Sequence, residues 1–167
     1  MKVFAGLALA LVFAVRAFGQ ETDPGKEAVG TIVVRVIHAT DGDPATAGDK
    51  AKAVSKAVSE RLQSEERLKF KHYREIGIDS KPLYRSYENW AQPLGTSDEV
   101  LVRFEAQSRP TKASARLGLE LWLSRKKVLK TDAEVSAERP LYVLGPAWRG
   151  GRLIISVALA PTSKPRS

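Results

Sequence analysis

The chain contains no cysteine, and its only methionine is Met1. The lack of cysteine excludes a disulfide framework, a cysteine-ligated metal, a thiol nucleophile and a lipid-modified N-terminal cysteine. Histidine is scarce as well, because His38 and His72 are the only two. A transition-metal site needs three or four ligands. We therefore expect no metal and no cofactor.

Catalytic motifs are also missing. The sequence has no Gly-x-Ser-x-Gly elbow, no phosphate-binding loop and no Gly-x-Gly-x-x-Gly. A carboxylate pair could be drawn from several acidic residues, but nothing in the sequence fixes their separation; they are Asp98, Glu99, Glu105 and Glu120. We assign no catalytic residue.

Long hydrophobic runs are absent except at the N-terminus. Val3–Val15 is an uncharged apolar stretch after Lys2, and Ala17–Gly19 carries small residues before Gln20. This is the pattern of a secretory signal peptide over residues 1–19, and the run is too short to span a bilayer. We therefore expect export to the periplasm or the medium, no transmembrane segment after cleavage, and no nucleic-acid partner.

The charge is basic, with 27 Lys and Arg against 19 Asp and Glu, for a formal net charge of +8. Lys2 and Arg16 are the only charged residues of the first 19, so the remainder keeps +6. Such a charge favours an envelope protein or an anionic polymer as partner. Because both signs are interspersed, it is equally typical of a charge that keeps a small protein soluble.

The length fits one domain. Residues 20–30 are polar with Pro24 and Gly25, which predicts a flexible lead-in. Residues 31–160 form the expected domain, and residues 161–167 form a polar tail that we expect to be mobile. The β-branched run 31–37 predicts a strand that is buried on most of both faces and central in a sheet.

A helix is expected over Ala45 to about Arg67, because Thr46 and Asp49 fit a capping box and apolar residues recur at helical spacing. Beyond the expected helix, apolar residues recur at every second position, which is the spacing of strands. Gly77 and Asp79–Pro82 read as breaks, and His72 as a half-buried sheet residue. The expected strands lie at 68–76, 83–90, 100–106, 117–123, 128–135, 141–144 and 153–159. The predicted class is α+β: an antiparallel sheet or sandwich with one amphipathic helix packed on it.

Two groups of residues are candidates for binding. Trp148, Arg149 and Arg152 surround the Gly150-Gly151 turn, and Trp and Arg are enriched at binding hot spots. The alternative is a hairpin whose glycines supply positive φ. Tyr84, Tyr87 and Trp90 could present an aromatic surface for sugar or peptide, or could be core residues.

The layout resembles a loosely defined group of small exported bacterial α+β proteins of unknown function. The resemblance spans roughly residues 31–159. It rests on the early strand that ends in His-Ala (36–39), an aromatic-x-x-Tyr-Arg element (70–74), a Gly-containing turn (144–146) and the Gly-Gly turn with the last strand (150–155). It implies export and an α+β domain, and it brings no activity or catalytic residue.

Taken together, the sequence predicts an exported, non-catalytic binding or assembly module of the bacterial cell envelope. A carbohydrate or polyanion binder is the first alternative. It predicts that one exposed face holds at least two of the residues Tyr84, Tyr87, Trp90 and Trp148. A hydrolase acting on such a polymer is the second, and it needs a cleft that combines His38 with Asp41 or Asp43. Partner recognition by strand pairing at a sheet edge is a further route.

Overall fold

The computed structural model describes residues 23–161, so the predicted signal peptide and the last six residues lie outside the described part. The elements in chain order are η1 (Pro24–Lys26), β1 (Ala28–Thr40), η2 (Pro44–Ala47), β2 (Lys52–Ala53), α1 (Lys56–Gln63), η3 (Glu66–Leu68), β3 (His72–Tyr84), β4 (Asn89–Ala91), β5 (Val100–Ala106), β6 (Ser114–Leu123), β7 (Lys126–Ser136), β8 (Leu141–Trp148) and β9 (Gly151–Leu159).

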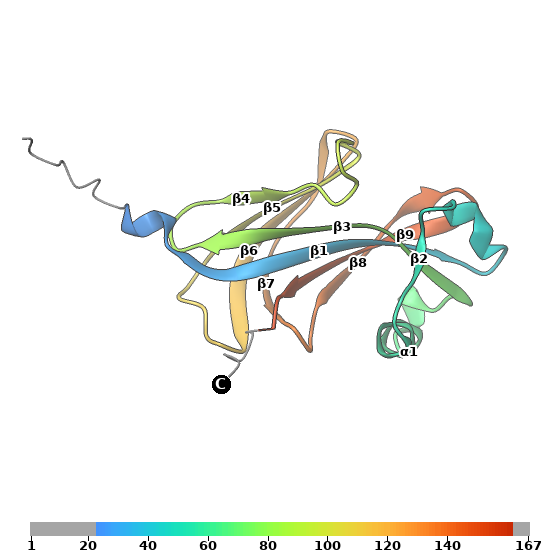
Figure 1. Cartoon of the computed structure of the whole chain (residues 1–167), viewed down its shortest axis with the longest axis horizontal. Coiled ribbons are helices and arrows are strands. Elements are labelled where there is room, and N and C mark those ends of the chain that lie inside the picture. Colours follow the sequence, from blue (N-terminus) through green and yellow to red (C-terminus); the bar gives the residue numbers. More distant parts are fainter. Residues whose placement is uncertain (1–22, 162–167) are drawn as a thin grey trace, which may run out of the picture.

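The strands form two antiparallel sheets. Sheet A has the order β2-β3-β1-β9-β8, and sheet B has the order β4-β5-β6-β7 (Figure 1). The main core fills the space between them, where Val34 and Ile155 of sheet A meet Phe104 and Leu117 of sheet B. The predicted α+β class, mostly antiparallel sheet with one α-helix, is confirmed.

Strand β1 is central, as its β-branched run predicts. It pairs with β3 on one side and β9 on the other. Ile32, Val34 and Val36 are fully buried against sheet B, while Ile37 faces the opposite side, under α1. The strand starts at Ala28, and η1 precedes it, so part of the expected lead-in is regular structure.

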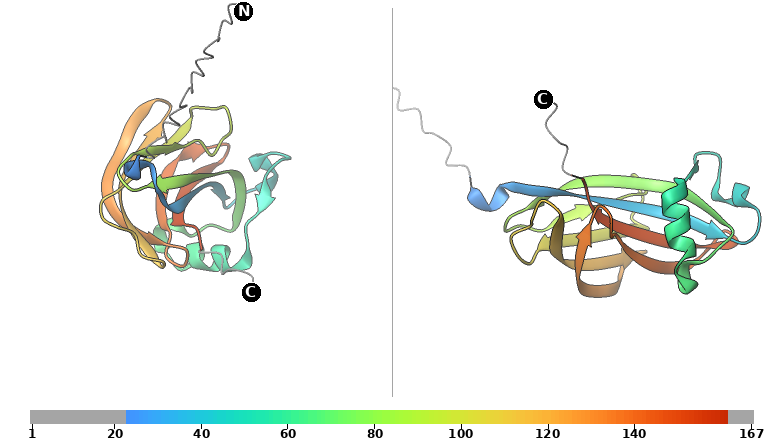
Figure 2. Two further views of the ribbon diagram at one scale, coloured as in Figure 1. Left: turned by 60° about the vertical axis from the view of Figure 1, so that its left-hand side comes forward. Right: turned by 90° about the horizontal axis from the view of Figure 1, so that it is seen from below.

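The predicted helix over residues 45–67 is wrong in its extent. The α-helix covers only Lys56–Gln63, and its N-cap is Ser55, whose Oγ accepts a hydrogen bond from the Val58 N–H at 3.3 Å. Residues 44–53 form η2 and β2 instead. Leu62 is fully buried, and α1 packs on the outer face of sheet A near one end (Figure 2).

Strand β3 is longer than the sequence indicates. It continues through Gly77 and residues 79–82, which read as breaks, and ends at Tyr84. Glycine is required at position 77 because the backbone of Pro93 approaches so closely that a Cβ would collide with it. His72 is exposed, and its neighbour Tyr73 is buried in its place.

The β6–β7 turn is tighter than expected. It consists of Ser124 and Arg125 alone, with φ of 47° and 65°, the left-handed geometry of a two-residue hairpin.

Strand β8 is longer than expected and does not end at Leu144. It passes an irregularity in its pairing with β9 and continues to Trp148.

Candidate binding site on the outer face of sheet B

The hairpin candidates are largely engaged in holding the hairpin. Trp148 is half-buried, and its ring lies edge-on to His38 with 5.3 Å between ring centroids. The guanidinium of Arg149 stacks on the Trp148 ring at 4.4 Å, and Arg152 donates two hydrogen bonds to the Gly145 carbonyl, at 2.8 and 3.2 Å. The segment is a hairpin, but its turn is one residue earlier than expected: Arg149 and Gly150 have φ of 43° and 73°, and Gly151 begins β9.

The tyrosine candidates do not join the hairpin. Tyr84 is half-buried at the end of β3. Tyr87 is exposed, but its hydroxyl donates to an Asp23 carboxylate oxygen at 2.7 Å. That hydrogen bond raises the pKa of Tyr87 and lowers the pKa of Asp23. Tyr87 therefore ties the β3–β4 connection to the segment before β1.

The hydrolase alternative needs His38 in a cleft beside an aspartate. His38 is fully buried, and its Nε2 lies 3.2 Å from the Trp148 carbonyl oxygen. Asp41 accepts from the Lys71 backbone N–H, and Asp43 accepts from the Ala45 N–H and caps η2. These contacts leave no His–Asp cleft at this strand end.

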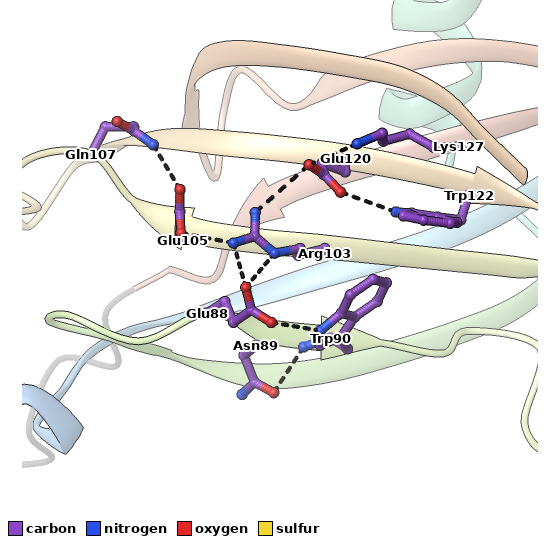
Figure 3. Close-up of polar contacts among 9 residues, drawn as sticks. All are labelled: Glu88, Asn89, Trp90, Arg103, Glu105, Gln107, Glu120, Trp122 and Lys127. Atoms are coloured by element: carbon purple, nitrogen blue, oxygen red, sulfur yellow. Dashed lines mark hydrogen bonds and ion pairs between the residues drawn. The ribbon is translucent and has the colours of Figure 1, made fainter.

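Trp90 is the candidate that meets a partner, and the partner is Trp122. Trp90 is 37% exposed on β4, and its ring centroid lies 6.0 Å from that of Trp122 on β6, with 54° between the ring planes. Both side chains lie on the outer face of sheet B (Figure 3). Strand β5 lies between β4 and β6, so the pair bridges three strands.

Carboxylates fix both indole rings. The Nε1–H of Trp90 donates to Glu88 at 3.3 Å, and the Nε1–H of Trp122 donates to Glu120 at 3.2 Å. Arg103 on β5 lies between the two carboxylates (Figure 3). It forms a hydrogen-bonded ion pair with Glu88, binds Glu105 at 3.0 Å and reaches Glu120 at 4.0 Å. One guanidinium thus links the supports of both tryptophans.

Two carboxyls of this network, those of Glu88 and Glu120, have lowered pKa values. The hydrogen bond from Arg103 is the main cause that lowers the pKa of Glu88, and the Trp90 indole adds to it. Burial works to raise the pKa of Glu120, but the hydrogen bonds from Trp122 and Lys127 outweigh it, so the pKa of Glu120 is lowered. A general acid needs a raised pKa, so neither carboxyl suits that role at neutral pH.

The two tryptophans differ in accessibility. Trp122 lies between Trp90 and Lys127, whose Nζ is 5.6 Å from the Trp122 ring centroid (Figure 3). Trp90 is therefore the ring that offers a face to a ligand. We name Trp90, Trp122, Glu88, Arg103 and Glu105 the platform.

The platform lies on the open side of the sandwich. Helix α1 packs against sheet A through Leu62 and Val58, and it is the only α-helix within residues 23–161. The outer face of sheet B therefore has no helical cover in the described part of the chain (Figure 2). The side chains of Glu88 and Glu105 on this face are 46% and 39% exposed.

The acidic cluster does not form a metal site. Glu88, Glu105 and Glu120 all turn towards the Arg103 guanidinium, which occupies the position that a cation would take. Between residues 23 and 161, no three His, Asp or Glu side chains are placed to hold a metal ion. Helices there are also too short and too polar to cross a membrane.

Sequence reasoning found Trp90 but missed Trp122, Arg103, Glu88 and Lys127. A signal existed in the strand alternation: Glu120 and Trp122 alternate with buried Leu119 and Leu121, which puts them on the outer face. The strand register, in contrast, could not be predicted from this alternation. It pairs Trp90 with Arg103, and it pairs Arg103 with Glu120, so that residues from three strands meet.

Comparison with known proteins adds no relative, because no family model, no curated protein and no solved structure matches this chain.

Proposed function

We propose that this chain is an exported, non-catalytic binding module of the bacterial cell envelope that holds a carbohydrate polymer on the platform. The observation that carries the proposal is the fixed Trp90–Trp122 pair on an uncovered sheet face. The signal-peptide pattern of residues 1–19 supports export.

The aromatic chemistry favours a sugar. The face of an indole carries negative charge density, and the C–H groups on the flat side of a pyranose ring carry weak positive charge. Stacking between them needs an indole whose orientation is already set. Glu88 fixes the Trp90 ring in that way, so little side-chain entropy is lost on binding.

The shape of the surface favours a polymer over a small molecule. Small ligands bind in concave pockets that bury most of their surface. The platform instead spreads across β4, β5 and β6 on the outside of the sheet, without a helix above it. An extended chain can lie along such a face and make several weak contacts, which together give useful affinity.

The test is retention of the purified protein by insoluble polysaccharides, namely peptidoglycan sacculi, cellulose and chitin. Trp90→Ala should weaken binding at least tenfold, because it removes the more exposed of the two indole rings of the platform. Trp122→Ala should weaken it as well, because it removes the ring on which Trp90 rests.

The matched control is Ile78→Ala, which truncates another exposed apolar side chain, 46% accessible, on a strand of sheet A. It should leave retention unchanged. Trp148→Ala tests the hairpin that the sequence singles out. If Trp148→Ala abolishes retention and Trp90→Ala does not, the binding site is the hairpin and the platform proposal is wrong.

An assembly role has one structural feature in its favour. Strands β7 and β8 are edge strands of the two sheets, and a groove of about 830 Å³ lies beside them, lined in part by Leu129, Leu141 and Val143. An extended segment of a partner protein could add a strand there. Recovery of one defined protein from envelope extract at low and moderate salt, retained by the Trp90→Ala variant, would favour this role over carbohydrate binding.

A further inference from the structure

We infer that the polymer bound by the platform is a neutral glycan and that anionic polymers are excluded from it. The inference rests on the proposed function and narrows its ligand class. It also distinguishes a carbohydrate ligand from a polyanion, two classes between which the net charge of the chain does not decide.

The charges beside Trp90 are acidic. The carboxylate of Glu88 is hydrogen-bonded to its indole and has a side chain 46% exposed, and Glu105 is 39% exposed on the next strand. Arg103 is only 20% exposed, and its guanidinium already binds both carboxylates. A polymer lying on Trp90 therefore meets negative charge, although the whole chain carries +8.

Two basic side chains of this face lie on the β7 side of Trp122. Lys127 and Lys130 are on β7, opposite Trp122 and Glu120 in the strand register. Lys127 is already bound to Glu120 at 3.4 Å and covers the Trp122 ring. Asp132 and Glu134 lie on the same side of β7 as Lys130, so charges of both signs are mixed there. Next to Trp90 the exposed charges are the carboxylates of Glu88 and Glu105, and these would repel an anionic polymer.

Hydroxyl groups suit the acidic side. A carboxylate only accepts hydrogen bonds, and a sugar hydroxyl donates one. Arg103 binds Oε2 of both carboxylates, while Glu88 Oε1 accepts from the Trp90 indole and Glu105 Oε1 accepts from the Gln107 side-chain amide at 3.2 Å. Each Oε1 keeps one lone pair to accept a further donor. Charge-assisted hydrogen bonds to hydroxyls on either side of the stacked ring would set its position on Trp90. A neutral polysaccharide presents a flat C–H face to Trp90 and hydroxyl groups to the carboxylates along its length.

The experiment compares polymers that share a backbone and differ in charge. The probes are hydroxyethyl cellulose and glycol chitin, which are neutral, and carboxymethyl cellulose and carboxymethyl chitin, which are anionic. Binding is measured by affinity electrophoresis of the intact protein at 20 mM and 500 mM NaCl. We expect at least one neutral polymer to bind at both salt concentrations, within about twofold, and Trp90→Ala to weaken that binding at least tenfold.

Binding to the carboxymethyl polymers should behave in the opposite way. Attraction between exposed charges is screened by salt, so it should fall at least tenfold at 500 mM NaCl and should not depend on Trp90. Glu105→Gln removes one negative charge from the Trp90 side. It should raise the affinity for the anionic polymers and, because it also replaces a charged hydrogen-bond acceptor of the platform, lower the affinity for the neutral ones.

The outcomes distinguish this inference from the proposed function. If Trp90→Ala removes carboxymethyl binding as strongly as neutral binding, the platform is a carbohydrate site without charge selection, and the inference is wrong while the proposed function stands. If anionic polymers alone bind through Trp90, the inference is wrong in the same way. If none of these polymers binds through Trp90, the inference is wrong; if retention by sacculi, cellulose and chitin is also independent of Trp90, the proposed function is wrong as well.

Discussion

A single side chain, Arg103, organises the candidate site. Its guanidinium reaches Glu88, Glu105 and Glu120, and two of these carboxylates in turn accept the indole N–H groups of Trp90 and Trp122. The geometry of two aromatic rings on β4 and β6 therefore depends on one residue of β5. Arg103 acts as a positioning residue, because a ligand on Trp90 would touch the ring and the carboxylates rather than the buried part of the guanidinium.

His38 is the second residue whose surroundings are unusual. The ring is fully buried, and its Nδ1 has no hydrogen-bond partner among the described residues. Burial lowers the pKa of His38 below its ordinary value; the hydrogen bond with the Trp148 carbonyl opposes this effect, and the nearby Arg149 cation adds to it. The folded chain therefore holds His38 in its neutral form.

This burial predicts a pH-dependent stability. An unfolded histidine takes up a proton near pH 6.5, whereas folded His38 does so only at lower pH. Below pH 6.5 the unfolded chain binds more protons, so the free energy of unfolding should fall as the pH drops, by at most about 1.4 kcal/mol per pH unit. Above pH 6.5 this contribution is fully present. Urea titrations between pH 5 and 8 measure it.

The control for this prediction is the other histidine. His38→Gln should flatten the dependence between pH 5 and 7, because the replacement does not titrate. His72 is exposed, so His72→Gln should leave the pH profile of the parent chain unchanged. Equal slopes for the parent and His38→Gln would show that His38 is not the group responsible.

Among the elements, strands were easier to predict than the helix. Strand β5 (Val100–Ala106) has the predicted bounds. Buried residues such as Val102 and Phe104 alternate with outward-facing ones, and this alternation is visible in the sequence because only one face of the strand is buried. The expected helix over 45–67 joined apolar residues that do share one core: Val54, Val58 and Leu62 all pack there. Only Val58 and Leu62 lie in α1, because the helix begins after its N-cap Ser55, which follows Val54 in the chain.

The helix start can be tested by the caps themselves. Ser55→Ala should lower the free energy of unfolding by about 1 kcal/mol, within the usual range of roughly 0.5–2 kcal/mol for a lost N-cap. The reason is that the Val58 N–H then loses its acceptor. Thermal or urea unfolding followed by circular dichroism measures the difference from the parent chain.

Thr46→Ala is the matched variant, since Thr46 is the cap that the sequence predicts. In the structure Thr46 lies in η2, and its hydroxyl donates to the Asp43 carbonyl at an exposed position. Its replacement should therefore change stability less than Ser55→Ala does. A larger loss for Thr46→Ala would mean that the helix starts near residue 46 after all.

The candidate site could be predicted only in part. Trp90 was identified from its side-chain chemistry, and the alternation along β6 placed Trp122 on the outer face, but nothing in the sequence joined the two. Their proximity depends on β5 lying between β4 and β6 in a set register, which is a long-range property of the sheet. Arg103 had no local signal either, because its three carboxylate partners come from β5, β6 and the segment before β4.

On the scale of the whole molecule, the two sheets share one core but have different outer faces. Val34 and Ile155 from sheet A pack with Phe104 and Leu117 from sheet B, so neither sheet buries its inner face alone. Sheet A carries α1 on its outside, and sheet B carries the platform. The platform should therefore hold its geometry only as long as sheet A supports sheet B from behind.

This shared core predicts a single unfolding transition reported alike from both sheets. Trp148→Phe leaves Trp90 and Trp122 as fluorescent reporters of sheet B, and the double variant Trp90→Phe/Trp122→Phe leaves Trp148 as the reporter of sheet A. Phe104→Ala should lower stability by about 3–5 kcal/mol, because Phe104 is fully buried. Added to each reporter chain, it should shift both urea midpoints to the same extent. If the Trp148 signal kept its midpoint while the sheet B signal moved, the sheets would unfold separately. In that case sheet A could not be what holds the platform rigid, and its rigidity would have to come from the Arg103 network alone.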